Sequence, residues 1–212
     1  MAKVLFLALV GTFVLVCSDD DNPVTEHDGF PHYKNLTQRE HVLNNLEHSY
    51  NERVVTRFDE LLDDNFTFFF SPGDVGGDIP QQWGRLQELR VTARLFDPAL
   101  DQPPYPTCRS IRVDIKFEEG VDWVTVIPED YPGELWYTTT LEYEFTFEMD
   151  PEMTYIAAPG SQAQFTVRNA GTGDAPQWRL VEWRDLAANS VALQSAASTD
   201  RTTWGGVKAL YK

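Results

Sequence analysis

The order of hydrophobic and polar positions predicts helices in the first half of the chain and strands in the second. Helical spacing of apolar residues begins after Thr37, which forms a capping-box pattern with Glu40, and recurs over residues 54–62 and 83–96. Alternating or continuously apolar stretches predict strands over residues 66–70, 109–117, 122–127, 135–149, 164–168 and 177–185. Residues 204–211 are predicted to form a short strand or an ordered tail. Helices followed by a run of strands indicate the α+β class.

Residues 177–186, QWRLVEWRDL, carry bulky side chains on both faces of the predicted strand. Strict alternation points Trp178 and Leu180 one way, and Val181, Trp183 and Asp185 the other. An edge strand would alternate between apolar and polar residues, so this pattern predicts a central strand with structure packed on each face. Asp185 then stands as a single carboxylate at the end of an apolar row.

The first 17 residues have the features of a secretory leader. Lys3 is followed by an apolar run from Val4 to Val16, which is shorter than the roughly 20 residues that a membrane-spanning helix needs. Cys17 stands where the run stops. Residues 14–17 resemble the lipobox of bacterial lipoproteins, although Val16 replaces the usual small residue. The first expectation is therefore a lipid anchor on Cys17, with ordinary secretion, an uncleaved anchor or a cysteine of no consequence as the alternatives.

Residues 18–35 are polar and carry no apolar period, so we expect a flexible tether between the leader and a single domain over residues 36–212. The resulting localisation is the bacterial cell envelope, through the lipid anchor, or the exterior after secretion. If Cys17 carries lipid, Cys108 is predicted to be a small core residue.

The amino-acid composition of the chain restricts the kinds of molecule that it is expected to bind. The 212 residues are 42% hydrophobic and 13% aromatic, enough for a substantial core, and 17 basic against 33 acidic side chains give a net charge of -16. No nucleic acid partner is expected, because phosphate binding needs clustered Lys and Arg, and contact with a membrane is expected only through the lipid anchor. Neither a cofactor nor a metal site is predicted, since His41 and His48 face outward and no Cys/His cluster is present.

The order and bulk of the predicted elements resemble the nuclear transport factor two-like superfamily, also called SnoaL-like. The resemblance covers about Leu36 to Tyr211. It is carried by residues 42–50 leading into 58–70, by Trp83-Gly84 with the helix after it, and by residues 178–185 followed by Trp204-Gly205. It implies a cone-shaped, strongly curved antiparallel sheet with three helices from the N-terminal half packed in its concave face. Members of this superfamily include both enzymes and binding modules, so fold alone does not choose between them.

The first functional hypothesis is a non-enzymatic domain that binds a small apolar ligand or a protein partner. Its candidate ligand-binding residues are Trp83, Trp136, Tyr143 and Trp183, because aromatic faces suit apolar ligands. The plainer interpretation of these four side chains is core packing. The surface of the sheet is in addition a candidate homodimer interface.

The alternative hypothesis is an enzyme of the isomerase or dehydratase kind. Asp185 would be the general base, with a pKa raised by an apolar pocket, and Tyr50 or Tyr143 would donate a hydrogen bond to the developing oxyanion. All four histidines fall in the tether or on an outward helix face, so few catalytic groups are at hand. The plainer interpretation of Asp185 is a carboxylate that caps a turn at the end of a strand.

Overall fold

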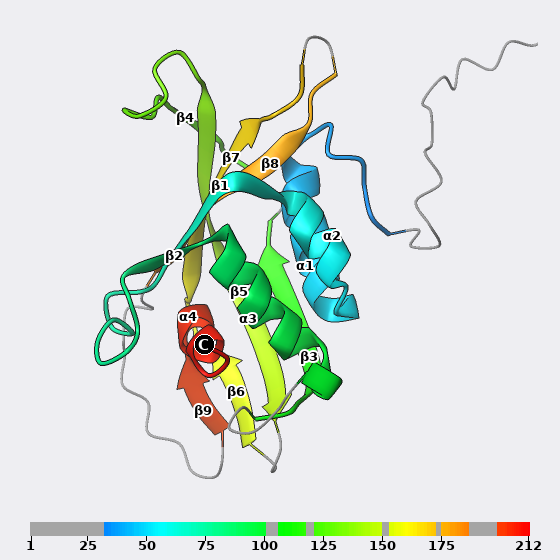
Figure 1. Cartoon of the computed structure of the whole chain (residues 1–212), viewed down its shortest axis with the longest axis vertical. Coiled ribbons are helices and arrows are strands. Elements are labelled where there is room, and N and C mark those ends of the chain that lie inside the picture. The colour runs from blue at the N-terminus through cyan, green and yellow to red at the C-terminus, as the bar shows by residue number, and fades with distance from the viewer. Residues whose placement is uncertain (1–31, 101–105, 118–120, 150–152, 173–174, 187–198) are drawn as a thin grey trace, which may run out of the picture. The chain divides into compact units, whose positions relative to one another are not determined.

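The described residues form one nine-stranded, strongly twisted sheet, and the helices pack on it (Figure 1). The computed structural model describes residues 32–100, 106–117, 121–149, 153–172, 175–186 and 199–212. The predicted leader, Cys17 and most of the tether lie outside these residues. Residues 33 and 34, expected in the tether, pack on the first helix, where Asn45 exchanges two hydrogen bonds with the backbone of Lys34 at 2.8 and 2.7 Å.

The strands follow the order β2-β1-β8-β7-β5-β6-β9, and β3 and β4 pair with the two halves of the long β5. Their bounds are β1 Leu62–Phe69, β2 Gln82–Gly84, β3 Cys108–Lys116, β4 Val124–Val126, β5 Trp136–Met149, β6 Met153–Ala157, β7 Gln162–Asn169, β8 Trp178–Leu186 and β9 Thr199–Thr202. The β1–β8 and β6–β9 pairs are parallel and the other pairs are antiparallel. The predicted α+β class with a strongly curved sheet is confirmed, and the sheet is mixed because of these two pairs.

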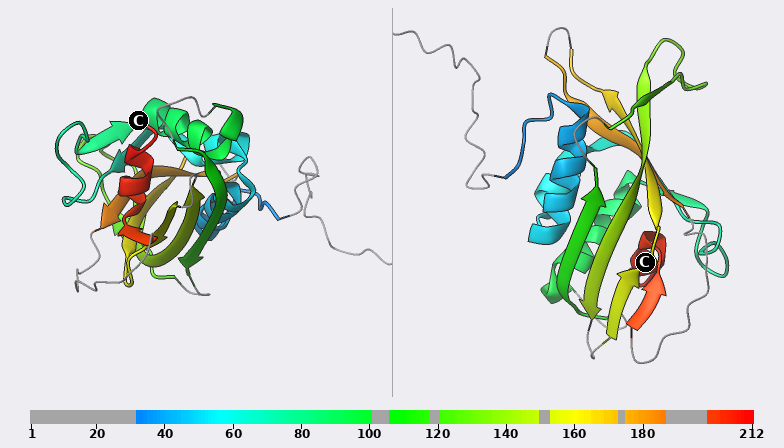
Figure 2. Two further views of the ribbon diagram at one scale, coloured as in Figure 1. Left: turned by 90° about the horizontal axis from the view of Figure 1, so that it is seen from below. Right: turned by 180° about the vertical axis from the view of Figure 1, so that it is seen from behind.

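The helices lie on one side of the curved sheet, as the view from below shows (Figure 2). They are α1 Arg39–Glu52, α2 Val55–Leu61, α3 Arg85–Phe96 and α4 Trp204–Ala209, with a 3₁₀ turn η1 at Pro98–Leu100. Their inner faces share one core with the sheet, in which Leu46, Phe58 and Leu95 expose at most 1% of their surface. Cys108 is buried in the same core, as predicted. No helix among the residues that the structure describes is both long and apolar enough to span a bilayer.

The predicted capping box at the start of α1 is wrong. The helix begins at Arg39, and its N-cap, Gln38, makes no side-chain capping hydrogen bond. The carboxylate of Glu40 instead accepts a hydrogen bond of 2.7 Å from Nε1 of Trp123. The side chain of Glu40 therefore makes a tertiary hydrogen bond to Trp123 in place of the capping hydrogen bond that the local sequence pattern predicted.

A bulge in β8 changes which side chains face the helices. Thr166 pairs with Glu182 while the next residue, Val167, pairs with Leu180, so Val181 is an extra residue in β8. Leu180 consequently lies in the same core as Trp183, and Val181 lines the opposite face of the sheet. The predicted facing, with Leu180 opposite to Trp183, is wrong because strict alternation ends at a bulge.

The C-terminal helix α4 covers the concave side of the sheet, where a short strand or a tail was predicted. Trp204, Val207, Lys208 and Tyr211 expose none of their surface. Thr203 caps the helix, since its Oγ1 accepts a hydrogen bond of 2.9 Å from the amide of Gly206. A six-residue helix with two glycines is not stable by itself in water, so its packing against the sheet holds it in this conformation.

Candidate functional site

Asp185 lies at the end of β8 on the inner face of the sheet, beneath the start of α4. Its carboxylate accepts hydrogen bonds from the hydroxyl of Tyr143 at 2.9 Å and from the amide of Gly205 at 2.5 Å, and the residue is 2% exposed. The hydroxyl of Tyr143 in turn accepts a hydrogen bond of 3.2 Å from the amide of Trp204. Both oxygens of Asp185 therefore have partners within the protein, and a substrate reaches them only if α4 moves.

The environment of Asp185 raises its pKa to about 6. Burial is the main cause, because it disfavours the charged form, and the nearby carboxylate of Asp74 adds to it. The hydrogen bonds from Gly205 and Tyr143 and the charge of Lys208 act in the opposite direction. Burial also raises the pKa of the Tyr143 hydroxyl far above its usual range, so Tyr143 is the hydrogen-bond donor of this pair. A carboxylate that is ionised near neutral pH beside a hydroxyl donor could accept a proton from a carbon acid.

We expect the folded wild type to gain stability relative to the Asp185→Asn variant as the pH falls. The folded-state pKa of about 6 is above the ordinary value of 3.8, so the charged form carries a penalty that is complete above pH 6 and is lost as the pH falls toward 4. The free energy of unfolding of the wild type relative to Asp185→Asn should rise by about 2–3 kcal/mol between pH 7 and pH 4. Urea unfolding of both proteins across this range measures the difference, and parallel profiles would contradict it.

Gly205 stands where α4 comes closest to Asp185. A Cβ atom there would lie 2.9 Å from Cδ1 of Phe70, 3.1 Å from Oδ2 of Asp74 and 3.2 Å from Oδ2 of Asp185. We expect Gly205→Ala to lower the free energy of unfolding by about 1–3 kcal/mol, because α4 must shift away from the sheet. Gly84→Ala is the matched control, since its Cβ would meet no atom closer than 3.8 Å. Equal stability of the two variants in urea would show that α4 is not closely packed here.

A buried ion pair joins α4 to α3. Nζ of Lys208 lies 2.7 Å from Oε1 of Glu88, whose Oε2 accepts a hydrogen bond of 2.7 Å from Nε1 of Trp83. Lys208 and Glu88 are both fully buried. Burial lowers the pKa of Lys208 to about 8, although the charge of Glu88 raises it.

The structure places Tyr50, the second predicted catalytic residue, in the aromatic core. Its ring packs edge-on against Phe58, Phe96 and Trp204, with ring centroids 4.9 to 5.6 Å apart. Burial holds the pKa of the Tyr50 hydroxyl well above its usual value. Interactions of this hydroxyl with the side chains of Thr92 and Trp204 lower its pKa but do not offset the effect of burial. The residue that contacts Asp185 is thus Tyr143, the other tyrosine proposed from the sequence.

The four predicted ligand-binding residues divide between the two faces of the sheet. Trp83, Tyr143 and Trp183 belong to the inner core and are at most 7% exposed. The ring of Trp183 packs against Phe68, Phe165 and Trp204. Trp136 lies elsewhere, because it lines a groove on the face of the sheet that is turned away from the helices. The four residues were predicted to share one site because the sequence pattern does not show on which face of the sheet each aromatic side chain lies.

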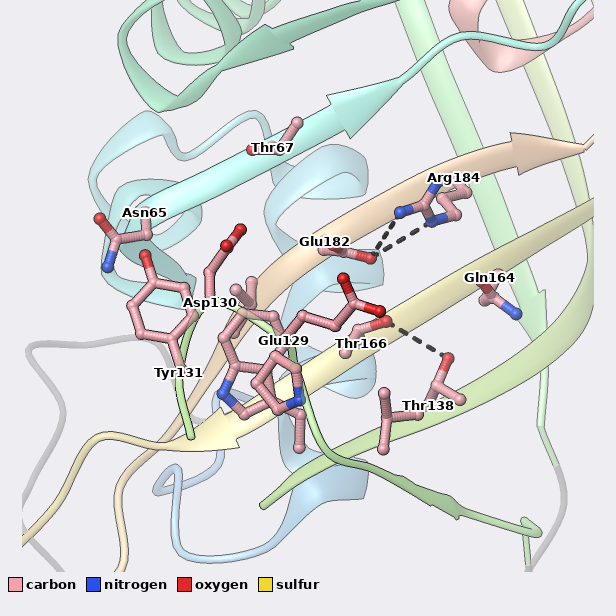
Figure 3. A pocket seen from close by; sticks show the side chains of 14 residues that line it. Asn65, Thr67, Glu129, Asp130, Tyr131, Thr138, Gln164, Thr166, Glu182 and Arg184 are labelled. Atoms are coloured by element: carbon pink, nitrogen blue, oxygen red, sulfur yellow. Dashed lines mark hydrogen bonds and ion pairs between the residues drawn. The ribbon is translucent and has the colours of Figure 1, made fainter. Parts of the chain in front are cut away.

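This outer groove has a volume of about 820 Å³. It lies between β1, β8, β7 and β5 and the turn that connects β4 to β5. Its lining is mostly polar, and consists of Asn65, Thr67, Val126, Pro128, Glu129, Asp130, Tyr131, Trp136, Thr138, Gln164, Thr166, Val181, Glu182 and Arg184. Three of these side chains are acidic and one is basic, and Arg184 pairs with Glu182 at 3.0 Å. The net charge of these side chains is therefore negative, and Figure 3 shows Glu129, Asp130, Glu182 and Arg184 in the groove.

An ion-pair network anchors the turn that borders the groove. Arg168 on β7 pairs with Asp63 at 2.7 Å and with Glu134 at 3.1 Å. Glu134 also accepts a hydrogen bond of 2.9 Å from Nε1 of Trp136. These contacts fix one end of the connection between β4 and β5 against the rest of the sheet.

Glu88 and Lys208 are two buried charged residues that the sequence did not single out. The helical face that is buried in α3 comprises Glu88, Val91, Thr92, Leu95 and Phe96, while Leu86 of the same helix is 74% exposed. The spacing of Glu88 with Val91 and Leu95 is a helical one and could have revealed it. In the part of the chain that the structure describes, no group of three or more His, Cys, Asp or Glu side chains is placed to hold a metal ion.

Neither a protein-family model nor a curated protein matches this sequence. Among solved structures, a conserved protein from Planctomyces limnophilus has a TM-score of 0.44 and 14% identity, over 69% of this chain and 91% of that one. An NTF2-like protein of unknown function from Pseudomonas putida has a TM-score of 0.44 and 10% identity, over 75% and 90% of the two chains. A putative aromatic ring hydroxylase from Novosphingobium aromaticivorans has a TM-score of 0.46 and 9% identity, over 68% and 82%.

Proposed function

We propose that this chain is a non-enzymatic binding domain, anchored at the cell envelope through Cys17 or secreted, that binds a protein partner carrying a basic segment. The observation that carries the proposal is the outer groove, which is open, acidic and bordered by an exposed strand. The chain as a whole has a net charge of -16, so a basic partner is attracted at long range as well.

The strand beside the groove favours a protein over a small apolar ligand. Among the described residues β4 pairs only with β5, so its other edge is free to add a strand. Val124 is 61% exposed on this strand, and Ile127 just after it is 68% exposed. The aromatic residues expected to hold an apolar ligand in the cone are, in contrast, packed against one another beneath α4.

A labelled peptide of alternating Val and Lys residues tests the proposal. We expect the intact protein to bind it, with an affinity that falls as salt is added, because the attraction is largely electrostatic. Replacing Glu129 and Asp130 by Gln and Asn should weaken binding about threefold to tenfold. Fluorescence anisotropy measures this, and Glu142→Gln, on the same face but outside the groove, is the matched control.

Two results would contradict the basic-partner proposal: equal binding of a Val/Glu peptide, or unchanged binding by the Glu129/Asp130 variant. Light scattering on the same sample distinguishes a separate partner from a second copy of this chain, the other occupant considered for the sheet surface. If the protein is a dimer and the dimer dissociates when the peptide binds, then the peptide and the second copy of the chain bind at the same groove.

An isomerase or dehydratase function is kept as the second candidate because of the geometry around Asp185. Its carboxyl group has a pKa near 6 and lies 2.9 Å from the hydroxyl of Tyr143. Solvent deuterium exchange into an enolisable ketone, followed by nuclear magnetic resonance, tests for proton abstraction. Exchange that survives Asp185→Asn would remove Asp185 from the reaction, and no exchange with the wild type would favour the binding function.

A further inference from the structure

The ammonium group of Lys208 lies between the aromatic rings of Phe68 and Trp183 and the carboxylate of Glu88, which we call the aromatic seat. Its Nζ lies 3.7 Å from the ring centroids of both Phe68 and Trp183, and 2.7 Å from the carboxylate of Glu88. Aromatic faces around a cation, together with one carboxylate, are the groups that recognise alkylammonium ions. The seat excludes water, because Lys208 and Glu88 expose none of their surface.

The groups closest to the cation come from outside α4. Phe68 comes from β1, Trp83 from β2, Glu88 from α3 and Trp183 from β8. Trp83 orients the carboxylate of Glu88 by a hydrogen bond of 2.7 Å. Helix α4 supplies the cation and the ring of Trp204, whose centroid lies 6.0 Å from Nζ. The rest of the chain therefore holds the carboxylate and the two nearest rings, which an external cation of the same shape could contact.

The interior next to this seat contains a polar atom that α4 leaves unpaired. Nε1 of Trp183 is buried and makes no hydrogen bond, whereas the hydroxyl of Tyr50 interacts with the side chains of Thr92 and of Trp204 in α4. The rings of Tyr50 and Trp183 are 6.2 Å apart, and both contact Trp204. Buried polar groups are normally paired, so α4 satisfies this interior incompletely.

Helix α4 is held to the sheet by its buried side chains, among them Trp204 and Val207, and by a few polar contacts. Besides the Lys208–Glu88 pair they include the amide of Gly205 on Asp185 and Nη1 of Arg94 on the carbonyl of Tyr211 at 2.8 Å. A helix this short does not persist alone, so it can leave the sheet as a unit.

We propose that Glu88, Phe68 and Trp183 form a binding site for an alkylammonium ligand, that Lys208 occupies this site as an intramolecular ligand, and that an amine competes with α4 for it. The ligand class is a primary amine on an unbranched alkyl chain, the chemistry that the lysine side chain itself presents. This site is separate from the outer groove, and neither proposal depends on the other.

The first test uses Lys208→Ala and n-butylammonium, which replaces the missing side chain. When the concentration of n-butylammonium is ten times its dissociation constant, it should raise the midpoint of thermal unfolding of Lys208→Ala by about 3–5 °C. n-Butanol, which has the same shape without the charge, should have little effect, and the added Glu88→Gln substitution should abolish the response to the amine. Equal responses to amine and alcohol, or a response that survives Glu88→Gln, would overturn the proposal.

The second test uses the wild-type chain and so does not depend on folding of the variant. Hydrogen exchange of the amides of α4 should accelerate at least about twofold in n-butylammonium chloride compared with sodium chloride at equal ionic strength, since the amine binds only when α4 is displaced. The amides of β7 provide the internal control and should not change. Exchange of α4 that is the same in both salts would show that no amine competes with Lys208. Variants of Glu129 and Asp130 should leave this result unaffected, which separates it from binding at the groove.

Discussion

Replacing Lys208 by Met is expected to lower the free energy of unfolding by about 3–5 kcal/mol. Methionine keeps most of the length of the side chain but removes the ammonium group that faces Glu88 at 2.7 Å. Glu88 must then stay buried without a partner or take up a proton, and either state costs free energy. Urea unfolding at pH 7, followed by circular dichroism, measures the loss.

The cost should be specific to the broken pair. Adding Glu88→Gln to Lys208→Met removes the isolated charge, so the double variant should be more stable than Lys208→Met alone. Lys116→Met is the matched surface control, because Lys116 is an exposed lysine paired with Asp114 and Glu144, and it should change stability little. A double variant as unstable as the sum of the two single variants would show that the carboxylate and the ammonium group are not coupled.

Replacing Trp204 by Ala is expected to lower the free energy of unfolding by about 3–5 kcal/mol through loss of packing. Trp204 is fully buried, and its ring contacts Tyr50, Tyr143 and Trp183 with centroids 4.4 to 5.2 Å apart. Removing it leaves a void where α4 meets the sheet, so the amides of α4 should also lose protection from hydrogen exchange.

Trp123→Ala is the control for this substitution. Trp123 is partly exposed, and donates one hydrogen bond to Glu40 at the start of α1. We expect a smaller loss of stability and no change in the exchange of α4. If the two variants lose equal stability, or if α4 remains protected in Trp204→Ala, then Trp204 does not hold the helix to the sheet.

Six of the nine strands that the structure describes and the first three helices were predictable because their hydrophobic patterns are local, whereas β2, β6 and β9 were not predicted. Residues 135–149 alternate over a long stretch, and β5 spans Trp136–Met149. Bulk on both faces of residues 177–186 predicted a central strand, and β8 lies between β1 and β7 in the sheet. Periodicity survives in these segments because each buries one continuous face in a single core.

The candidate site was predicted less completely, because its residues are far apart in the sequence and come into contact only in the folded chain. Asp185 was singled out as a carboxylate at the end of an apolar row, and it is buried at the inner face beside Tyr143. Glu88 and Lys208 are 120 positions apart in the numbering and each looks, by composition, like an ordinary surface charge. The two glycines of α4 argued against a helix, and packing outweighs their propensity.

The sequence by itself determined the α+β class and the density of aromatic residues in the core, because hydrophobic spacing along the chain encodes which faces are buried. The curvature of the sheet was expected only from the resemblance to a known superfamily. Tertiary structure alone decided that α4 covers the concave side, that the bulge in β8 turns Val181 outward, and that the open groove lies on the far face of the sheet. These outcomes depend on contacts between residues distant in the chain. The free energy of such contacts outweighs the local preferences that a sequence displays.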